Sequence, residues 1–328
     1  MDKPEVYPIK GPADENLQIP FHYQEGEYLK GNIKEYYEQE GYAVIRNAIP
    51  KALCDTIIEA FRREVKPYPG FIYRQASANP EKHVFTEDEF MLNSILNLQS
   101  LDSTKFNTFR EASMDLLSHS GLHETLADLF GTKAQLVQSM FFEGNPATWA
   151  HQDTYYLDSE QIGSMCGVWF ALEDIHPGAG RFYIYPGSQK INVEKNGGDF
   201  EIAFHHDRYK NLVKEIIRDK KLECKAPPLN KGDILIWNSK TIHGSLAVTQ
   251  PEVSRMSITG HYIPDSHGFL QFQKIPKPLA LREYKGVQMH MAKDLNNWKN
   301  KIIFAVETNF PQFFQSLKRY LISKKLKS

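Results

Sequence analysis

The alternation of hydrophobic and polar positions divides the chain into a helical first part and a strand-rich second part. Before Gly131 the hydrophobic residues recur at helical spacing. Gly41 and Gly131 can each supply a left-handed helix stop, and Pro50 can open a helix because the first turn needs no amide from that position. The predicted helices cover about 33–40, 50–61 and, as a pair, 104–130.

Short runs rich in β-branched and aromatic residues follow, separated by turn sequences such as Pro177-Gly178-Ala179-Gly180. The predicted strands are 43–45, 134–142, 165–172, 181–185, 233–237 and 255–262. Helices followed by closely spaced strands favour an antiparallel sandwich or barrel with helices packed outside. A charged insert at about 191–221, with one helix-like stretch at 209–218, interrupts the strands where a lid or substrate loop would lie.

The length of 328 residues fits one large domain. Residues 1–30 contain scattered Pro and charges, so we expect an irregular N-terminal arm there. Residues 31–308 form the expected single domain, whose strand core covers about 134–262. Residues 309–328 carry an apolar helical stripe and then five cations without an acid at the end, which predicts a basic amphipathic helix.

Composition excludes several classes of protein. Lys and Arg number 39 and Asp and Glu number 40, so no global charge favours nucleic acid, and we expect a small-molecule partner. Three separated cysteines, Cys54, Cys166 and Cys224, indicate neither disulfides nor a zinc site. No signal-peptide-like or bilayer-spanning apolar run occurs, so we expect a cytoplasmic protein and leave its oligomeric state open.

The chemistry is concentrated in the stretch around His151 and Asp153. In an extended strand, residues two apart point to the same face, so both side chains would project together. A third ligand from a distant strand, His243, would complete one face of a metal and leave three positions open. That arrangement suits ferrous iron in oxygenases. Without a third ligand the pair would be an ordinary polar strand edge.

Arg255 lies twelve residues after His243 on an apolar run. Its planar guanidinium suits the distal carboxylate of an oxo-diacid, because the two groups form paired charge-assisted hydrogen bonds. Pairing with a surface acid is the alternative, and the apolar strand argues against it. The cluster His205-His206-Asp207 lies in the charged insert, so we interpret it as a solvated face.

These motifs resemble the phytanoyl-CoA dioxygenase family of iron(II)- and 2-oxoglutarate-dependent oxygenases. The resemblance rests on WAHQD from Trp149, ALEDIHPGAGRFYIYPGSQK from Ala171, GDILIWNS from Gly232, and HGS at His243 followed by Arg255. It implies a double-stranded β-helix (jelly roll, cupin-like). It also implies that His151, Asp153 and His243 bind Fe(2+) and that Arg255 binds 2-oxoglutarate.

The resemblance suggests further contacts. Ser245, Gln138 and Met140 fall where the family places groups near the co-substrate. Substrate contacts are expected among Phe142, Trp149, Tyr155, Tyr156, Arg181, Trp237 and Ser257. The alternative for the aromatic residues is ordinary core packing. Arg181 departs from the family pattern, and we expect it either to touch an acidic substrate or to point outward.

The resemblance implies that O2 and 2-oxoglutarate are consumed, with succinate and CO2 released, while a small molecule is hydroxylated or oxidatively modified in a specialised biosynthetic pathway. Related halogenases replace the acidic ligand, so Asp153 favours hydroxylation. The alternatives are a non-catalytic jelly-roll binding protein, or the same cofactors with desaturation, cyclisation or C–N cleavage. The basic C-terminal helix either docks on the barrel with a solvated tail or attaches weakly to a membrane or acidic partner.

Overall fold

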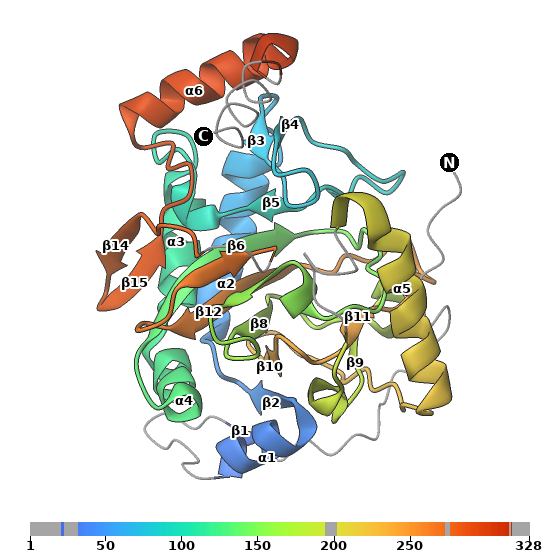
Figure 1. Ribbon diagram of the computed structural model, residues 1–328. Helices are drawn as coiled ribbons and strands as arrows, with labels where there is room; N and C mark the ends of the chain where they lie inside the picture. The colour runs from blue at the N-terminus through green and yellow to red at the C-terminus, as the bar shows by residue number, and fades with distance from the viewer. Residues whose placement is uncertain (1–20, 23–31, 194–201, 273–275, 315, 317–328) are drawn as a thin grey trace.

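The computed structural model describes residues 21–22, 32–193, 202–272, 276–314 and 316. A large mixed sheet runs through the middle of the molecule (Figure 1), with its neighbouring strands in the order β1-β2-β10-β8-β12-β6-β15-β14 and β5 paired with β6. Its strands are β1 (Phe21–His22), β2 (Tyr42–Arg46), β5 (Ile95–Leu96), β6 (Ala134–Phe142), β8 (Cys166–Ala171), β10 (Ile234–Asn238), β12 (Ser257–Pro264), β14 (Leu281–Tyr284) and β15 (Val287–His290).

Two small strand pairs accompany this sheet. They are β9 (Phe182–Ile184) with β11 (His243–Ser245), and β7 (Leu157–Ser159) with β13 (Phe269–Gln271); a separate pair joins β3 (Ile72–Tyr73) to β4 (Pro80–Glu81). Phe182 and Ile184 share one hydrophobic cluster with Trp169 and Leu235 of the large sheet, so the two layers enclose a common interior. The predicted jelly roll is confirmed.

Helices cover the other face of the large sheet, as the alternation along β12 requires. Ile258 and Tyr262 belong to the core cluster shared with the helices, whereas His261 lies on the interior side, with its Nε2 3.4 Å from Asp153. The rings of Phe61 and Phe109 lie 4.5 and 5.2 Å from that of Phe141 on β6. The helices are α1 (Asn32–Glu40), α2 (Lys51–Ala60) continued by a π-helix at Phe61–Val65, α3 (Asn107–Leu117) and α4 (Ser120–Phe130). They match the predicted ones, and Gly41 and Gly131 follow α1 and α4 with the expected positive φ.

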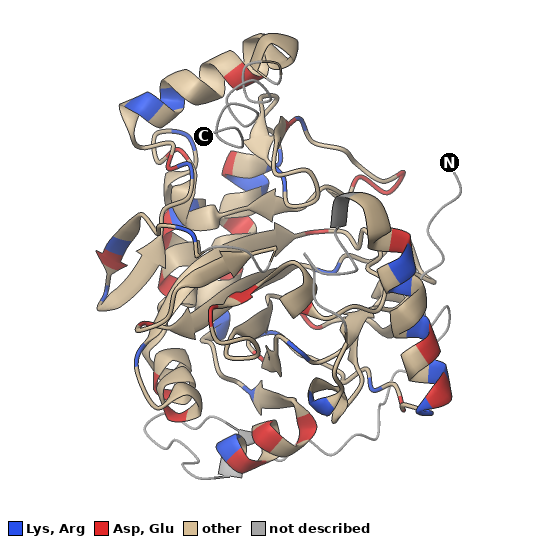
Figure 2. Cartoon of the chain, in the orientation of Figure 1, with Lys and Arg blue, Asp and Glu red and all other residues tan. Residues whose placement is uncertain are grey.

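The charged insert contains α5 (Ile202–Asp219), which lies beside β9 and β11 in Figure 1 and carries charges of both signs in Figure 2. Its buried side chains Tyr209, Val213 and Ile217 share a cluster with Tyr183 and Tyr185. The insert therefore covers the small sheet, while residues 194–201 lie outside the described residues.

The end of the chain differs from expectation. The hairpin of β14 and β15 was not predicted, and it lengthens the large sheet by a parallel pairing of β15 with β6. A helix, α6, occupies Trp298–Asn309, before the predicted start at 309, and after Phe310 the described residues 311–314 are helical, inside the predicted range. Most of the predicted helix at 309–328 lies outside the described residues, as does most of the arm at 1–30, of which Phe21–His22 form β1. Within the described residues, no helix has the length and apolar character needed to cross a bilayer.

Candidate metal and co-substrate site

Backbone pairing brings two distant histidines together. His151 and His243 form an antiparallel bridge in which each amide donates to the carbonyl of the other, at 3.0 and 2.9 Å. Residues paired in this way present their side chains to the same face. The two imidazole rings accordingly lie 4.4 Å apart, and both are buried.

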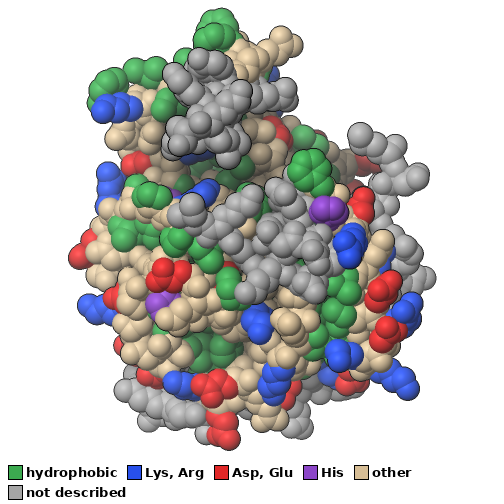
Figure 3. All heavy atoms as spheres, viewed as in Figure 1, with side chains coloured by type: hydrophobic (Ala, Val, Ile, Leu, Met, Phe, Trp, Pro, Cys, Tyr) green, Lys and Arg blue, Asp and Glu red, His purple; other side chains and the backbone are tan. Residues whose placement is uncertain are grey.

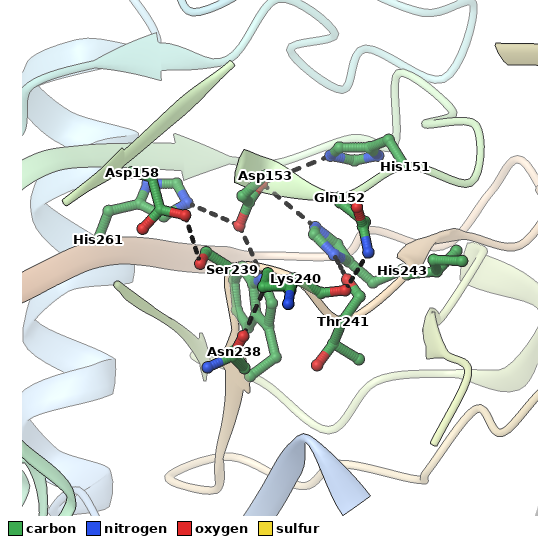
Figure 4. A network of polar contacts seen from close by, with 12 residues as sticks. His151, Gln152, Asp153, Asp158, Asn238, Ser239, Lys240, Thr241, His243 and His261 are labelled. Atoms are coloured by element: carbon green, nitrogen blue, oxygen red, sulfur yellow. Dashed lines mark hydrogen bonds and ion pairs between the residues drawn. The ribbon is translucent and has the colours of Figure 1, made fainter. Parts of the chain in front are cut away.

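Asp153 completes the group. Its Oδ1 lies 3.5 Å from Nε2 of His151 and 3.5 Å from Nε2 of His243, and one ligand atom from each residue lies within 4.8 Å of the others. Figure 4 shows the carboxylate between the imidazoles. The prediction that His151 and Asp153 lie on one extended strand is wrong. Gln152 is extended, but Asp153 begins a 3-10 turn at Asp153–Tyr155. The turn still places the carboxylate beside the histidines.

Hydrogen bonds set the tautomer of both histidines. Nδ1 of His151 lies 2.9 Å from the carbonyl of Trp149, and Nδ1 of His243 lies 2.9 Å from the carbonyl of Thr241. A carbonyl only accepts, so each Nδ1 carries the proton and each Nε2 keeps its lone pair for a ligand. Burial lowers the pKa of His243 to about 4, so this imidazole is neutral near pH 7.

The second carboxylate oxygen of Asp153 is held separately. The indole Nε1 of Trp237 donates to Oδ2 at 2.8 Å, and Nε2 of His261 lies 3.4 Å from the same oxygen. Burial alone would raise the pKa of Asp153, but the nearby His243, together with His151 and His261, holds it well below its usual value. The indole ring lies against Gly167, where any Cβ would come within 2.1 Å of it.

The loop before His243 fastens the loop that carries Asp153 (Figure 4). The carbonyl of Ser239 accepts from the amide of Thr154 at 3.1 Å, and the Ser239 hydroxyl donates to Asp158 at 2.9 Å. The side-chain amide of Gln152 donates to the carbonyl of Lys240. The two ligand-bearing segments are thus positioned by one polar network.

Arg255 is buried without a carboxylate beside it among the described residues. Its side chain is 4% exposed, one Nη donates to the carbonyl of Gly180 at 2.9 Å, and Nε has no hydrogen-bond partner. Burial lowers its pKa to about 10. A buried cation of this kind is costly unless an anion pairs with it, so the guanidinium fits a carboxylate ligand.

The remaining predicted co-substrate residues lie on the interior face. In the register of β6 and β12, Gln138, Met140 and Phe142 lie opposite His261, Thr259 and Ser257, and directly opposed residues share a face. The guanidinium of Arg255 lies 5.9 Å from the centre of the Phe142 ring.

Two predicted serines have local hydrogen bonds. The hydroxyl of Ser245 donates to Asn145 at 3.1 Å and accepts from the amide of Thr148 at 2.8 Å, so it holds the loop before Trp149. The hydroxyl of Ser257 donates to the carbonyl of Arg255 at 3.3 Å. Asn145 also donates to the Gly180 carbonyl that Arg255 uses, which links this loop to the guanidinium.

Arg181 does not point outward. It is buried, and its Nε and one Nη donate to the carbonyl of Ile175 at 3.4 and 3.3 Å. The alternative that Arg181 points outward is therefore wrong, because its guanidinium donates to a loop carbonyl inside the protein. Trp237 is likewise fully buried and holds Asp153.

Trp149, Tyr155 and Tyr156 form an aromatic cluster with His206 and Tyr209 of α5. The Tyr155 and Tyr209 rings stack at 3.6 Å, and the Trp149 and His206 rings lie 4.6 Å apart. The interpretation of His205-His206-Asp207 as a solvated face is therefore wrong for His206, which is partly buried against the site, while its two neighbours are exposed. The charge pattern of the insert could not predict the burial of His206, because that burial depends on the break in α5 at His205, which turns His206 inward.

Cavity volume does not mark this site. A cavity of about 330 Å³ is lined by Tyr37, Phe130 and Cys166 among others, and none of the residues above borders it. The site is identified by its donor set of two imidazoles and one carboxylate and not by this cavity.

Comparisons with known proteins agree with this geometry. The sequence profile of the phytanoyl-CoA dioxygenase (PhyH) family matches residues 37–257, more than half of the chain. Phytanoyl-CoA dioxygenase domain-containing protein 1 from Danio rerio is 29% identical over 260 residues, which cover 69% of this chain and 87% of that protein. The peroxisomal phytanoyl-CoA dioxygenase of Homo sapiens is 23% identical over 269 residues, covering 74% and 72%.

Among solved structures, EctD from S. alaskensis in its apoform aligns with a TM-score of 0.55 at 14% sequence identity, covering 83% of this chain and 92% of that one. At this identity the likeness shows the fold alone. EctD has also been solved with bound Fe, and with 2-oxoglutarate and 5-hydroxyectoine.

Proposed function

Because the chain belongs to the phytanoyl-CoA dioxygenase family of iron- and 2-oxoglutarate-dependent oxygenases, we propose that His151, Asp153 and His243 hold ferrous iron in an enzyme that hydroxylates a small molecule. The observation that carries the proposal is the convergence of two Nε2 lone pairs and one carboxylate oxygen within 4.8 Å. Two imidazoles and one carboxylate on one side of a metal are the donor set of non-haem iron(II) oxygenases.

Arg255 supports 2-oxoglutarate as the co-substrate. The guanidinium is buried and reaches only a backbone carbonyl among the described residues, so a carboxylate would relieve its desolvation. Gln138 and Met140 lie on the interior face of the adjacent strand, where they would contact the rest of the co-substrate.

Iron bound there together with 2-oxoglutarate would supply O2 activation: one oxygen atom would enter the succinate formed as 2-oxoglutarate loses CO2, and the other would enter the substrate. The chain's own residues prepare this chemistry. The Nδ1 bonds to the carbonyls of Trp149 and Thr241 orient both imidazoles and leave each Nε2 for the metal, and Trp237 fixes the carboxylate. Burial of all three side chains excludes bulk water from the ligand face.

Hydroxylation in a specialised biosynthetic pathway is the outcome we propose. Asp153 occupies the position that would have to be vacated for a halide, which favours oxygen transfer over halogenation. Desaturation, cyclisation and C–N cleavage would use the same residues, and mass analysis of the product separates them. The scattered cysteines, all free, fit the reducing cytoplasm that we propose as its location.

The test is anaerobic loading with iron and 2-oxoglutarate, followed by exposure to air and measurement of succinate. We expect His151→Ala and Asp153→Ala each to abolish iron binding and succinate release. Asp219→Ala, an exposed aspartate at the end of α5, is the matched control and should behave as the wild type. Normal iron binding in the first two variants, or no succinate from the wild type with any substrate, would leave the non-catalytic jelly roll as the better account.

A further inference from the structure

Polar atoms without partners gather beside the proposed ligands. Among the described residues, the buried side-chain atoms that make no hydrogen bond include Nε1 of Trp149, the hydroxyls of Tyr155 and Tyr156, and Nδ1 of His206. We call these four residues the roof cluster. They come from two segments far apart in sequence, the loop around Asp153 and the first half of α5.

The roof cluster lies directly against His151. The ring of Tyr156 is 5.6 Å and that of Trp149 6.5 Å from the His151 ring. His206 lies 4.6 Å from Trp149 and 6.0 Å from Tyr156, and Tyr155 lies 5.0 Å from Tyr156. A substrate that reaches the metal from the α5 side would therefore meet these four residues.

The chemistry of these atoms restricts what they would bind. An indole N–H only donates, whereas a phenol hydroxyl both donates and accepts. Burial lowers the pKa of His206, so its imidazole is neutral near pH 7. Buried polar groups without partners are costly, and in native proteins they are usually satisfied by water or a ligand. An aliphatic chain would satisfy none of them.

The shape of the cluster adds a second restriction. The aromatic rings offer flat apolar faces next to the polar atoms, and the Lys210 ammonium lies 4.6 Å from the centre of the Trp149 ring. Flat rings with hydrogen-bonding groups at their edges suit a compact ligand whose C–H faces alternate with hydroxyls.

We propose that the roof cluster is the substrate-recognition site and that it takes a small polyhydroxylated compound of the sugar or glycoside class, not an aliphatic acyl chain. The inference rests on the proposed function, because it places the substrate beside the iron. It assigns to Trp149, Tyr155, Tyr156 and His206 the hydrogen bonds that the protein itself leaves unmade.

Tyr209 has a different role. Its hydroxyl accepts from the amide of Gln152 at 3.1 Å, and its ring stacks on Tyr155, so it anchors α5 one turn after His206. The helix is non-helical at His205, immediately before the residue that we assign to recognition. Tyr209 therefore positions the roof cluster and is not a suitable residue for testing substrate contact.

The first experiment separates the inference from the proposed function. Anaerobic charge-transfer absorbance reports iron and 2-oxoglutarate binding. Succinate release in air is then measured with glucose, glucosamine, glucuronate and methyl glucoside as probes, and with palmitoyl-CoA. We expect at least one sugar probe to raise succinate release above the probe-free rate, and palmitoyl-CoA to leave it unchanged. Stimulation by palmitoyl-CoA alone, or by no sugar probe, overturns the substrate class while iron and 2-oxoglutarate binding still stand.

The second experiment tests the residues with the most active sugar probe. Trp149→Phe and Tyr156→Phe each keep a ring and remove one hydrogen-bonding atom, so each should raise the KM for that probe about tenfold. The KM for 2-oxoglutarate should not change. Tyr262→Phe is the matched control, because its hydroxyl donates to the carbonyl of Leu117 in the core on the opposite face of the sheet. An unchanged KM for the probe in both Trp149→Phe and Tyr156→Phe overturns the assignment.

Discussion

The indole N–H of Trp237 donates a 2.8 Å hydrogen bond to Oδ2 of Asp153, whereas Oδ1 of the same carboxylate lies 3.5 Å from Nε2 of both His151 and His243. The two oxygens therefore have separate partners. With Oδ2 held by the indole, the carboxylate presents one oxygen to the histidine side, which leaves the remaining coordination positions for other ligands.

We expect Trp237→Phe to weaken ferrous iron binding by about ten- to a hundredfold, because the phenyl ring fills the space but cannot hold Oδ2. Anaerobic titration with iron measures the effect. Trp298→Phe, an exposed tryptophan on α6, is the control and should bind iron as the wild type does. Wild-type affinity in Trp237→Phe would show that packing alone orients Asp153.

The role of Arg255 predicts a different kinetic pattern. Arg255→Lys keeps the charge but loses the paired donors, so the KM for 2-oxoglutarate should rise about ten- to a hundredfold while iron affinity stays the same. Arg110→Lys is the control: this arginine is also buried, but its Nε donates to the carbonyl of Gln99. An equal rise in both variants would mean that the effect comes from general destabilisation.

Local sequence patterns were sufficient for much of the fold. The strand at 134–142 was predicted to the residue, because its ends are set by nearby turn residues and its side chains are almost all apolar or pair with the interior. The β14–β15 hairpin was not, because three of its eight side chains are exposed and three are half-buried, so only Val287 and Met289 on β15 show a buried alternation. Its turn, with positive φ at Lys285 and Gly286, was the available signal.

Part of the site could likewise be predicted from the sequence, and part could not. Residue types and their order were enough to suggest His151, Asp153, His243 and Arg255. Trp237 as the partner of Asp153 could not be read from the sequence, since it depends on β10 lying beside Gly167 of β8, a contact across the sheet. His206 depends equally on where the insert folds back.

Acid should destabilise the protein through His83. Burial, together with Arg74, whose Nη lies 3.1 Å from Nδ1, lowers its pKa to about 4, while Nε2 donates to the carbonyl of Val65. The unfolded chain therefore takes up this proton more readily than the folded one. The stabilisation is complete above about pH 6.5 and is lost as the pH falls towards 4.

Urea unfolding at pH 7 and pH 4.5 measures this loss. Between pH 7 and pH 4.5 the free energy of unfolding should fall less in His83→Gln than in the wild type. Because His83 is only partly buried, we expect this difference to be on the order of 1 kcal/mol. His205→Gln, which changes an exposed histidine, should keep the wild-type sensitivity. If His83→Gln loses as much stability in acid as the wild type, carboxylates alone account for the acid effect.

The last prediction concerns α6, which lies at the top of the molecule, where hydrophobic side chains are visible on the surface (Figure 3). On α6, Trp298, Ile302 and Ile303 are 66%, 54% and 45% exposed, and the sequence continues with a run of cations from Lys318 to Lys327. An apolar helix face joined to cations is typical of weak attachment to an anionic membrane. We therefore propose that α6 binds such a surface.

Co-sedimentation with vesicles of phosphatidylglycerol and of phosphatidylcholine tests this. We expect binding to the anionic vesicles, lost in high salt and reduced by Trp298→Gln combined with Ile302→Gln, because removing the two side chains removes the apolar area that enters the interface. Phe204→Gln is the matched control, since Phe204 is 78% exposed on α5. Equal binding to both kinds of vesicle would show that the cations do not contribute to binding. An equal reduction by Phe204→Gln would show that α6 is not the binding surface.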